Sequence, residues 1–256
     1  MLTKIRNTET CRLALDVFII SNFIFLGLDV ALAHAIDAYV LVELAPCIFS
    51  ALATVALLIW RERRLARLLV AGGAIAVGII GMVLHLEGSY FVDLTTRSLV
   101  YAAPFVAPLA FTGVGCLLLL TCYVDSDDVA WGQWVLFLAA CGWAGNFILS
   151  VLDHAQNGFF VVLEWIPVFS CALLLGALLV AMLQPYRQHW YCVVLLVLNA
   201  AIGVLGFVLH LLANIARGEM WLHGTPLFAP LLLPNLAVLA AIGLWGYRLT
   251  ASARRH

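Results

Sequence analysis

Charged residues are scarce in this sequence. Lysine, arginine, aspartate and glutamate make up only 11% of its 256 residues, whereas 65% are apolar. A soluble domain carries about 25% charged residues, so this chain has too little polar surface to cover itself in water. The net charge of −1 argues against a nucleic-acid partner.

Several local signatures are missing as well. The seven cysteines show no CxxC or zinc-ribbon spacing, so we expect no disulfide framework. Signatures for phosphate binding, nucleotide binding and nucleophilic catalysis are absent, as is the alternating pattern of membrane β-barrels. The first apolar run is longer than a signal peptide and lacks an A-x-A cleavage site, so we expect it to be a retained helix.

What the sequence does contain is a series of long apolar stretches. About 20 apolar residues cross a bilayer as a helix, and helices are required because lipid cannot satisfy open backbone groups. The sequence therefore predicts an all-α integral membrane protein with eight transmembrane helices in the lipid bilayer. These helices are expected at residues 13–33, 39–60, 68–86, 98–122, 131–152, 160–183, 191–213 and 226–247.

Positive charge is distributed unevenly over the two faces of this topology. Eleven of the thirteen basic residues lie on the face that carries both termini, and only Arg97 and Arg217 lie on the other. Basic residues are enriched in cytoplasmic loops. We therefore expect both termini in the cytoplasm and the chain in a bacterial inner (plasma) membrane.

The two halves of the chain repeat several short motifs in a constant order. These pairs predict two tandem four-helix repeats, residues 1–124 and 125–256, that together form one membrane domain. Because each copy has an even number of helices, a pseudo-two-fold axis along the membrane normal should relate the copies. The pairs are Asn22-Phe23-Ile24 with Asn146-Phe147-Ile148, Glu43-x-x-Pro46 with Glu164-x-x-Pro167, Gly78-x-x-Gly81 with Gly203-x-x-Gly206, and Pro104-x-x-x-Pro108 with Pro226-x-x-x-Pro230.

Ionisable residues gather at the outer ends of the predicted helices. Six of them have a counterpart in the other half and lie roughly 25 to 33 Å from the cytoplasmic helix ends. Such groups are costly when they face lipid and usually mark a functional site inside the bundle. We expect the six to converge near the pseudo-two-fold axis. They are Asp29, Glu43, His85, Asp153, Glu164 and His210.

Four carboxylates and two imidazoles are ligands suited to divalent iron, manganese or zinc, as one ion or as a dinuclear centre. The set is similar in composition to the ligands of ferritin-like di-iron proteins, although the Glu-x-x-His spacing of that class is absent. His154, Glu87 and His34 would support these ligands from nearby. Two alternatives are a metal-free polar network and a haem held between His85 and His210.

Three functions compete at this point. The first is a membrane metalloprotein near the outer face, acting as an oxidoreductase on a hydrophobic substrate. The second is a non-catalytic membrane subunit or assembly factor whose outer face docks a protein partner. The third is a transporter, which is disfavoured because the middle and inner thirds of the helices are almost bare of polar groups.

Overall fold

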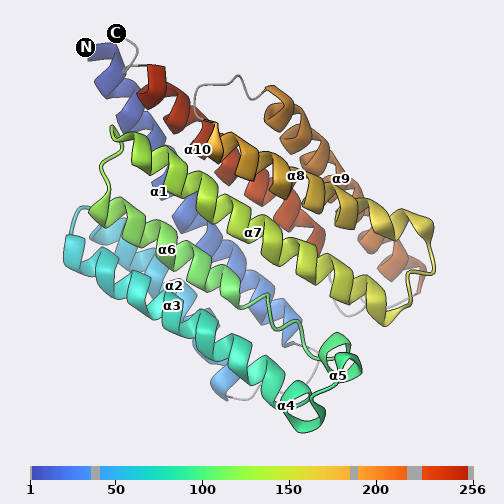
Figure 1. Ribbon diagram of the computed structural model, residues 1–256. Coiled ribbons are helices and arrows are strands. Elements are labelled where there is room, and N and C mark those ends of the chain that lie inside the picture. The colour runs from blue at the N-terminus through green and yellow to red at the C-terminus, as the bar shows by residue number, and fades with distance from the viewer. Residues whose placement is uncertain (1, 36–40, 185–189, 218–226, 253–256) are drawn as a thin grey trace.

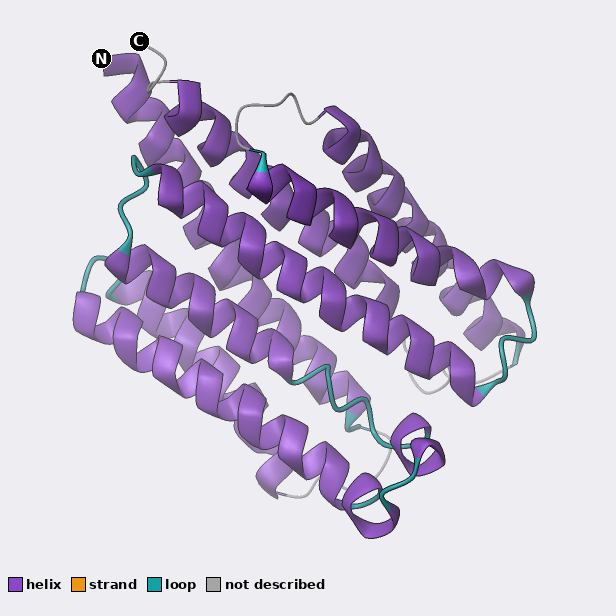
Figure 2. Cartoon of the chain, in the orientation of Figure 1, coloured by secondary structure: helices purple, strands orange, loops and turns teal. Residues whose placement is uncertain are grey.

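The computed structural model describes residues 2–35, 41–184, 190–217 and 227–252, and these residues form helices joined by turns and loops, with no strand (Figure 2). The helices of the first half are α1 (Leu2–Ala33), α2 (Leu41–Ile59), α3 (Arg64–Glu87), α4 (Tyr90–Asp93), α5 (Thr96–Val100) and α6 (Leu109–Tyr123). Those of the second half are α7 (Val129–Gln156), η1 (Val162–Glu164), α8 (Trp165–Leu183), α9 (Trp190–Ala216), η2 (Ala229–Leu231) and α10 (Leu232–Ser252).

Seven helices in the described part of the chain are long and apolar enough to cross a membrane, namely α1, α2, α3, α7, α8, α9 and α10. The chain is thus an all-helical protein whose helices suit a lipid bilayer.

The fourth expected span, residues 98–122, differs from the prediction. Helix α6 has only 15 residues, about 22 Å at 1.5 Å per residue, and the segment before it is irregular. Pro104 and Pro108 explain the difference, because a residue before proline avoids the helical conformation. Pro108 occupies the N-cap of α6, and α10 likewise begins only after a 3₁₀ turn that contains Pro230.

The helices form two groups of four that lie side by side (Figure 1). In the first group α1 contacts α2 and α6, while α3 contacts α2 and α6; in the second, α7 contacts α8 and α10, while α9 contacts α8 and α10. The groups meet where α1 contacts α10 and α6 contacts α7. Both termini lie at one end of the molecule (Figure 1). We call this the terminal end, and the opposite end, where α1, α3, α7 and α9 finish, the distal end.

Paired glycines allow close helix approach in both groups. A Cβ atom at Gly78 of α3 would lie 2.8 Å from the Pro108 carbonyl oxygen, and a Cβ atom at Gly203 of α9 would lie 2.6 Å from the Pro230 carbonyl oxygen. One turn later, Gly81 meets the Pro108 ring and Gly206 the Pro230 ring in the same way. In each group, therefore, a helix with two glycines packs directly against a proline segment.

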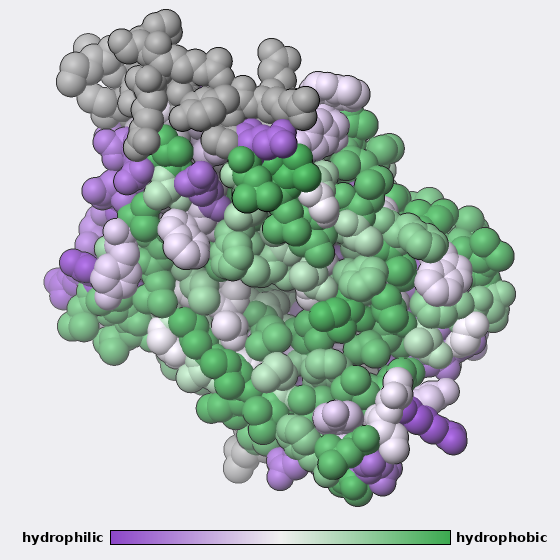
Figure 3. Space-filling view, in the orientation of Figure 1, coloured by the Kyte–Doolittle hydropathy of each residue, from purple (hydrophilic) through white to green (hydrophobic). Residues whose placement is uncertain are grey.

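The apolar side chains form a core that runs through both groups, with large buried rings such as Trp143, Phe23 and Phe111. Many other apolar side chains are exposed, for example Leu52 at 65% and Val197 at 64%. Figure 3 shows a mostly hydrophobic face with hydrophilic residues gathered toward the two ends. An apolar band between two polar ends is the surface expected of a protein surrounded by lipid.

Candidate functional site

Two histidines meet at the distal end of the first group. His34, just past the end of α1, and His85, in the last turn of α3, have ring centroids 6.2 Å apart. The His34 Nδ1 lies 2.9 Å from the Val30 carbonyl oxygen, and the His85 Nδ1 lies 3.3 Å from the Pro104 carbonyl oxygen. Asp29 on α1 is close enough to interact electrostatically with His34. The α1 terminus, the end of α3 and the proline segment before α6 thus enclose this pair.

A histidine and a carboxylate meet at the distal end of the second group. The His154 Nδ1 of α7 lies 3.8 Å from the Glu164 Oε2, and the Glu164 side chain is only 14% exposed. That oxygen is buried and makes no hydrogen bond. His210 of α9 is close enough to interact electrostatically with His154. The second group therefore also brings two imidazoles near one carboxylate.

The turn between α7 and α8 places Glu164 opposite His154. Gly158 and Phe159 both have positive φ, at 72° and 53°, so the chain reverses sharply after α7. The Asn157 amide donates a hydrogen bond of 3.4 Å to the Glu164 Oε1. The Phe159 ring stacks on Trp165 at 4.0 Å, which fixes the start of α8.

The remaining predicted residues lie at the same end of the molecule. Glu43 is half-buried in the first turn of α2, Asp153 is half-buried on α7, and Glu87 is exposed at the end of α3. In the described parts of the chain, no group of three or more histidine, cysteine, aspartate or glutamate side chains is arranged to hold a metal ion. Metal binding, and convergence of the six residues on one axis, therefore stay predictions.

Sequence reasoning treated His34 and His154 as supporting residues, yet His34 lies beside His85 and His154 lies beside Glu164. His34 has no counterpart in the repeat, and the repeat pattern favoured Asp153 over its neighbour His154. The Pro104 carbonyl oxygen was also missed as a partner of His85. The short α7–α8 loop could have indicated the contact between His154 and Glu164, because it returns the chain past the end of α7.

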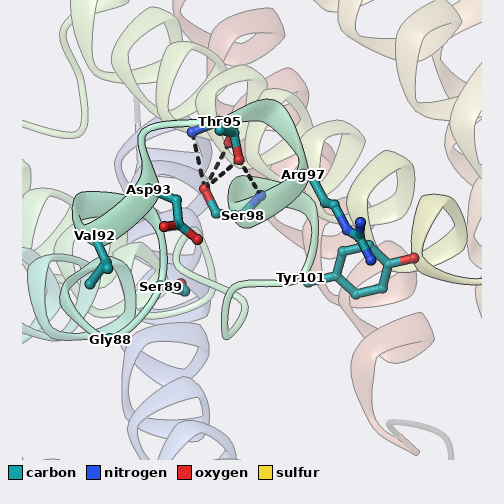
Figure 4. A pocket seen from close by; sticks show the side chains of 8 residues that line it. All are labelled: Gly88, Ser89, Val92, Asp93, Thr95, Arg97, Ser98 and Tyr101. Atoms are coloured by element: carbon teal, nitrogen blue, oxygen red, sulfur yellow. Dashed lines mark hydrogen bonds between the residues drawn. The ribbon is translucent and has the colours of Figure 1, made fainter.

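A shallow, open pocket of about 420 Å³ lies beside this end of the first group, between α4 and α5 (Figure 4). Thr95 and Ser98 in its wall bond to each other as the capping box of α5. Figure 4 shows Arg97 reaching toward Tyr101 and away from Asp93; its guanidinium lies 6.0 Å from the Tyr101 ring centroid. Thr95, Ser98 and Arg97 are thus engaged locally.

Buried polar contacts also occur away from the distal end, where the sequence indicated few polar groups. At the terminal end the Arg67 Nη2 of α3 donates hydrogen bonds of 2.5 Å to both the Asp16 carboxylate of α1 and the Thr121 hydroxyl of α6. Asp16 and Arg67 are 5% and 4% exposed. Between the groups, Asn22 of α1 and Asn235 of α10 exchange hydrogen bonds of 3.3 and 2.6 Å.

Comparison with known proteins adds no relative: no protein-family model, curated protein or solved structure matches this chain.

Proposed function

We propose that this chain is a membrane metalloprotein in which each four-helix group binds one divalent metal ion at its distal end. The observation that carries the proposal is the grouping of imidazoles and carboxylates by half. The first half supplies His34, His85, Asp29 and Glu43, and the second supplies His154, His210, Asp153 and Glu164. Two imidazoles with one or two carboxylates suit iron, manganese or zinc.

The observed spacings are close to those of shared metal ligands. With metal–nitrogen bonds of about 2.0 to 2.1 Å, two imidazoles on one ion have ring centroids roughly 5 to 6 Å apart, and those of His34 and His85 are 6.2 Å apart. Two donor atoms of a tetrahedral site lie roughly 3 to 3.5 Å apart, and the His154 nitrogen is 3.8 Å from the Glu164 oxygen. Small side-chain movements would bring each of these two pairs onto an ion.

The proposal includes a tandem duplication of a four-helix unit. Pairing α1 with α7, α2 with α8, α3 with α9 and α6 with α10 matches each helix contact within the first group to one within the second. The contacts between the groups also exchange under this pairing, because α1 with α10 corresponds to α7 with α6. The glycine contacts to Pro108 and Pro230 follow the same rule. A pseudo-two-fold axis along the membrane normal accounts for all three observations.

The proposed topology has eight crossings, with α6 and the irregular segment before it as the fourth. Both termini are then cytoplasmic, because this topology puts eleven of the thirteen basic residues on the face that carries both termini, and the metal sites face the outer leaflet. Arg187, Arg254 and Arg255 of this count lie outside the described residues. A reporter fused after His256 should be active only in the cytoplasm, and activity on the outer side would overturn the topology.

A metal at this depth would act as a redox centre or Lewis acid on a hydrophobic substrate that arrives from the lipid. Exposed apolar side chains precede Glu164 along the chain, including Phe160 at 73% and Val162 at 83% exposure. An oxidoreductase acting on a lipid-soluble substrate is the reaction class that this position favours.

Metal analysis of the purified protein tests the proposal. After mild detergent extraction without chelators, we expect two equivalents of iron, manganese or zinc per chain. His34→Ala with His85→Ala should remove one equivalent, and His154→Ala with His210→Ala should remove the other. If the ligands instead form one dinuclear centre on the axis, either pair of substitutions removes both ions.

Asp93→Ala provides the matched control, because Asp93 is an exposed carboxylate at the same end of the molecule, and this variant should keep both ions. Wild-type protein that holds no stoichiometric metal, even after incubation with each of the three ions, would overturn the metalloprotein. The distal clusters would then be polar networks of a non-catalytic membrane subunit.

A further inference from the structure

Arginines crowd the turn between α2 and α3 at the terminal end. Residues 61 to 64 read Arg-Glu-Arg-Arg, and all four side chains are exposed. Arg12, also exposed, lies on α1 one turn before Asp16, and Asp16 itself reaches Arg61 at 3.6 Å. Arg12 therefore lies close to the turn.

Nearby carboxylates neutralise only part of this charge. Asp16 pairs with the buried Arg67, and Arg61 lies between Asp16 and Glu62, 3.4 Å from the latter. Over the described residues, no carboxylate comes within ion-pair distance of the Arg12, Arg63 or Arg64 side chains, although Glu9 lies one turn before Arg12. Three guanidinium groups thus keep their donors for an external anion.

Two aromatic residues mark the depth of these arginines. Trp60, 44% exposed, immediately precedes the turn, and Tyr123, 66% exposed, ends α6. Tryptophan and tyrosine are enriched where membrane meets water. The Arg64 guanidinium lies over the Tyr123 ring, 5.0 Å from its centroid, so it is held at the headgroup level.

We propose that Arg12, Arg63 and Arg64 bind the phosphate of an anionic phospholipid at the terminal end of the first half. Guanidinium groups bind phosphate through paired hydrogen bonds. The buried Asp16 anchors the turn through Arg61 and Arg67 and leaves the outer arginines to the lipid. The offset that pairs Arg67 with Cys192 aligns Arg63 and Arg64 with Gln188 and His189, which lie outside the described residues, so the second half has no arginine at these two positions.

Native mass spectrometry of protein released from nanodiscs tests this site. The nanodiscs contain phosphatidylcholine and phosphatidylglycerol in equal amounts, and we expect wild-type protein to retain phosphatidylglycerol preferentially. Arg63→Gln with Arg64→Gln should lower this preference roughly tenfold, because each arginine near an anionic surface contributes severalfold to affinity. Arg63→Lys with Arg64→Lys keeps the charge and should lose less.

The matched control removes two arginines from the other end, through Arg97→Gln with Arg217→Gln, and should leave the preference unchanged. An equal loss in this control would overturn the proposal, because overall charge would then explain the selectivity. Displacement of the lipid by millimolar inorganic phosphate would also overturn it in favour of a free-anion site. If the Arg63→Gln, Arg64→Gln variant aggregates, the wild-type protein, the lysine variant and the control still test the site. Wild-type protein that retains both lipids equally contradicts it.

Discussion

The terminal ends of the two halves are held together by different chemistry. In the first half, Asp16, Arg67 and Thr121 form a buried hydrogen-bonded cluster that joins α1, α3 and α6. The proposed repeat aligns these positions with small residues at the corresponding places on α7, α9 and α10, namely Ala140, Cys192 and Gly243. Ala140 and Cys192 are 3% and 0% exposed, and a Cβ atom at Gly243 would lie 3.0 Å from Leu136.

This difference between a polar cluster and small residues indicates that one helix arrangement can be stabilised in two ways. Small residues let helices approach closely and gain packing, whereas a buried ion pair joins three helices but depends on every partner being present. The polar cluster is therefore the more fragile of the two. The polar cluster also links the ends of these helices to the arginine turn through the contact between Asp16 and Arg61. The second half lacks this contact.

Replacing Arg67 should produce the largest loss of stability. Arg67→Cys, which introduces the residue of the second half, leaves the Asp16 carboxylate buried without its partner and should lower the free energy of unfolding by about 3 to 5 kcal/mol. Unfolding in mixed micelles with a denaturing detergent measures this loss. Cys192→Ala in the second half should cost far less.

The triple variant Asp16→Ala, Arg67→Cys, Thr121→Gly sharpens the test, because it copies all three residues of the second half. An ion pair replaced entirely by apolar groups is often as stable as the original, so the triple variant should recover most of the loss. A triple variant less stable than Arg67→Cys alone would show that the two ends are not equivalent.

Alanine at the paired glycines should have the next largest effect, and a similar one in both halves. A Cβ atom at Gly78 or Gly203 would overlap the backbone of a proline segment, and overpacking of this kind costs about 1 to 3 kcal/mol. Gly72→Ala on α3 and Gly176→Ala on α8 are the controls, because an added Cβ meets nothing within 4 Å there.

The control substitutions should be neutral or slightly stabilising, since alanine favours the helix more than glycine does. Thermal unfolding in detergent compares the four variants. If only one of Gly78→Ala and Gly203→Ala is destabilising, the two halves do not share the glycine–proline contact and the duplication loses its best structural support.

The sequence predicted seven of the long apolar helices well, because lipid imposes a simple requirement for length and apolarity. It misplaced the starts of α6 and α10, where Pro108 and Pro230 outweigh an otherwise continuous apolar run. Hydropathy averages over such local backbone effects. The predicted site residues do lie at one end, since helix counting fixes depth.

Which of these residues meet could not be predicted in the same way. Depth says nothing of the rotation of a helix or the path of a loop, and those decide that His154 rather than Asp153 faces Glu164. Asp16 and Arg67 are 51 residues apart, and no periodic pattern connects them. Contacts of this kind depend on how whole helices pack.

The smallest expected difference concerns two asparagines that the proposed repeat makes equivalent. Asn22 and Asn146 are 5% and 6% exposed, but Asn22 exchanges two hydrogen bonds with Asn235 across the boundary between the groups. The Asn146 amide instead lies 3.7 Å from the Cys171 sulfur within its own group, and thioether and thiol sulfurs are weak acceptors.

Hydrogen bonds between membrane helices contribute about 0.6 kcal/mol on average and up to about 1.7. Asn22→Ala should therefore lower the free energy of unfolding by about 1 kcal/mol, and Asn146→Ala by less. A double-mutant cycle with Asn235→Ala isolates the pair, and it should show a coupling energy with Asn22 but none with Asn146. Zero coupling between Asn22 and Asn235 would mean that apolar packing alone joins the two halves.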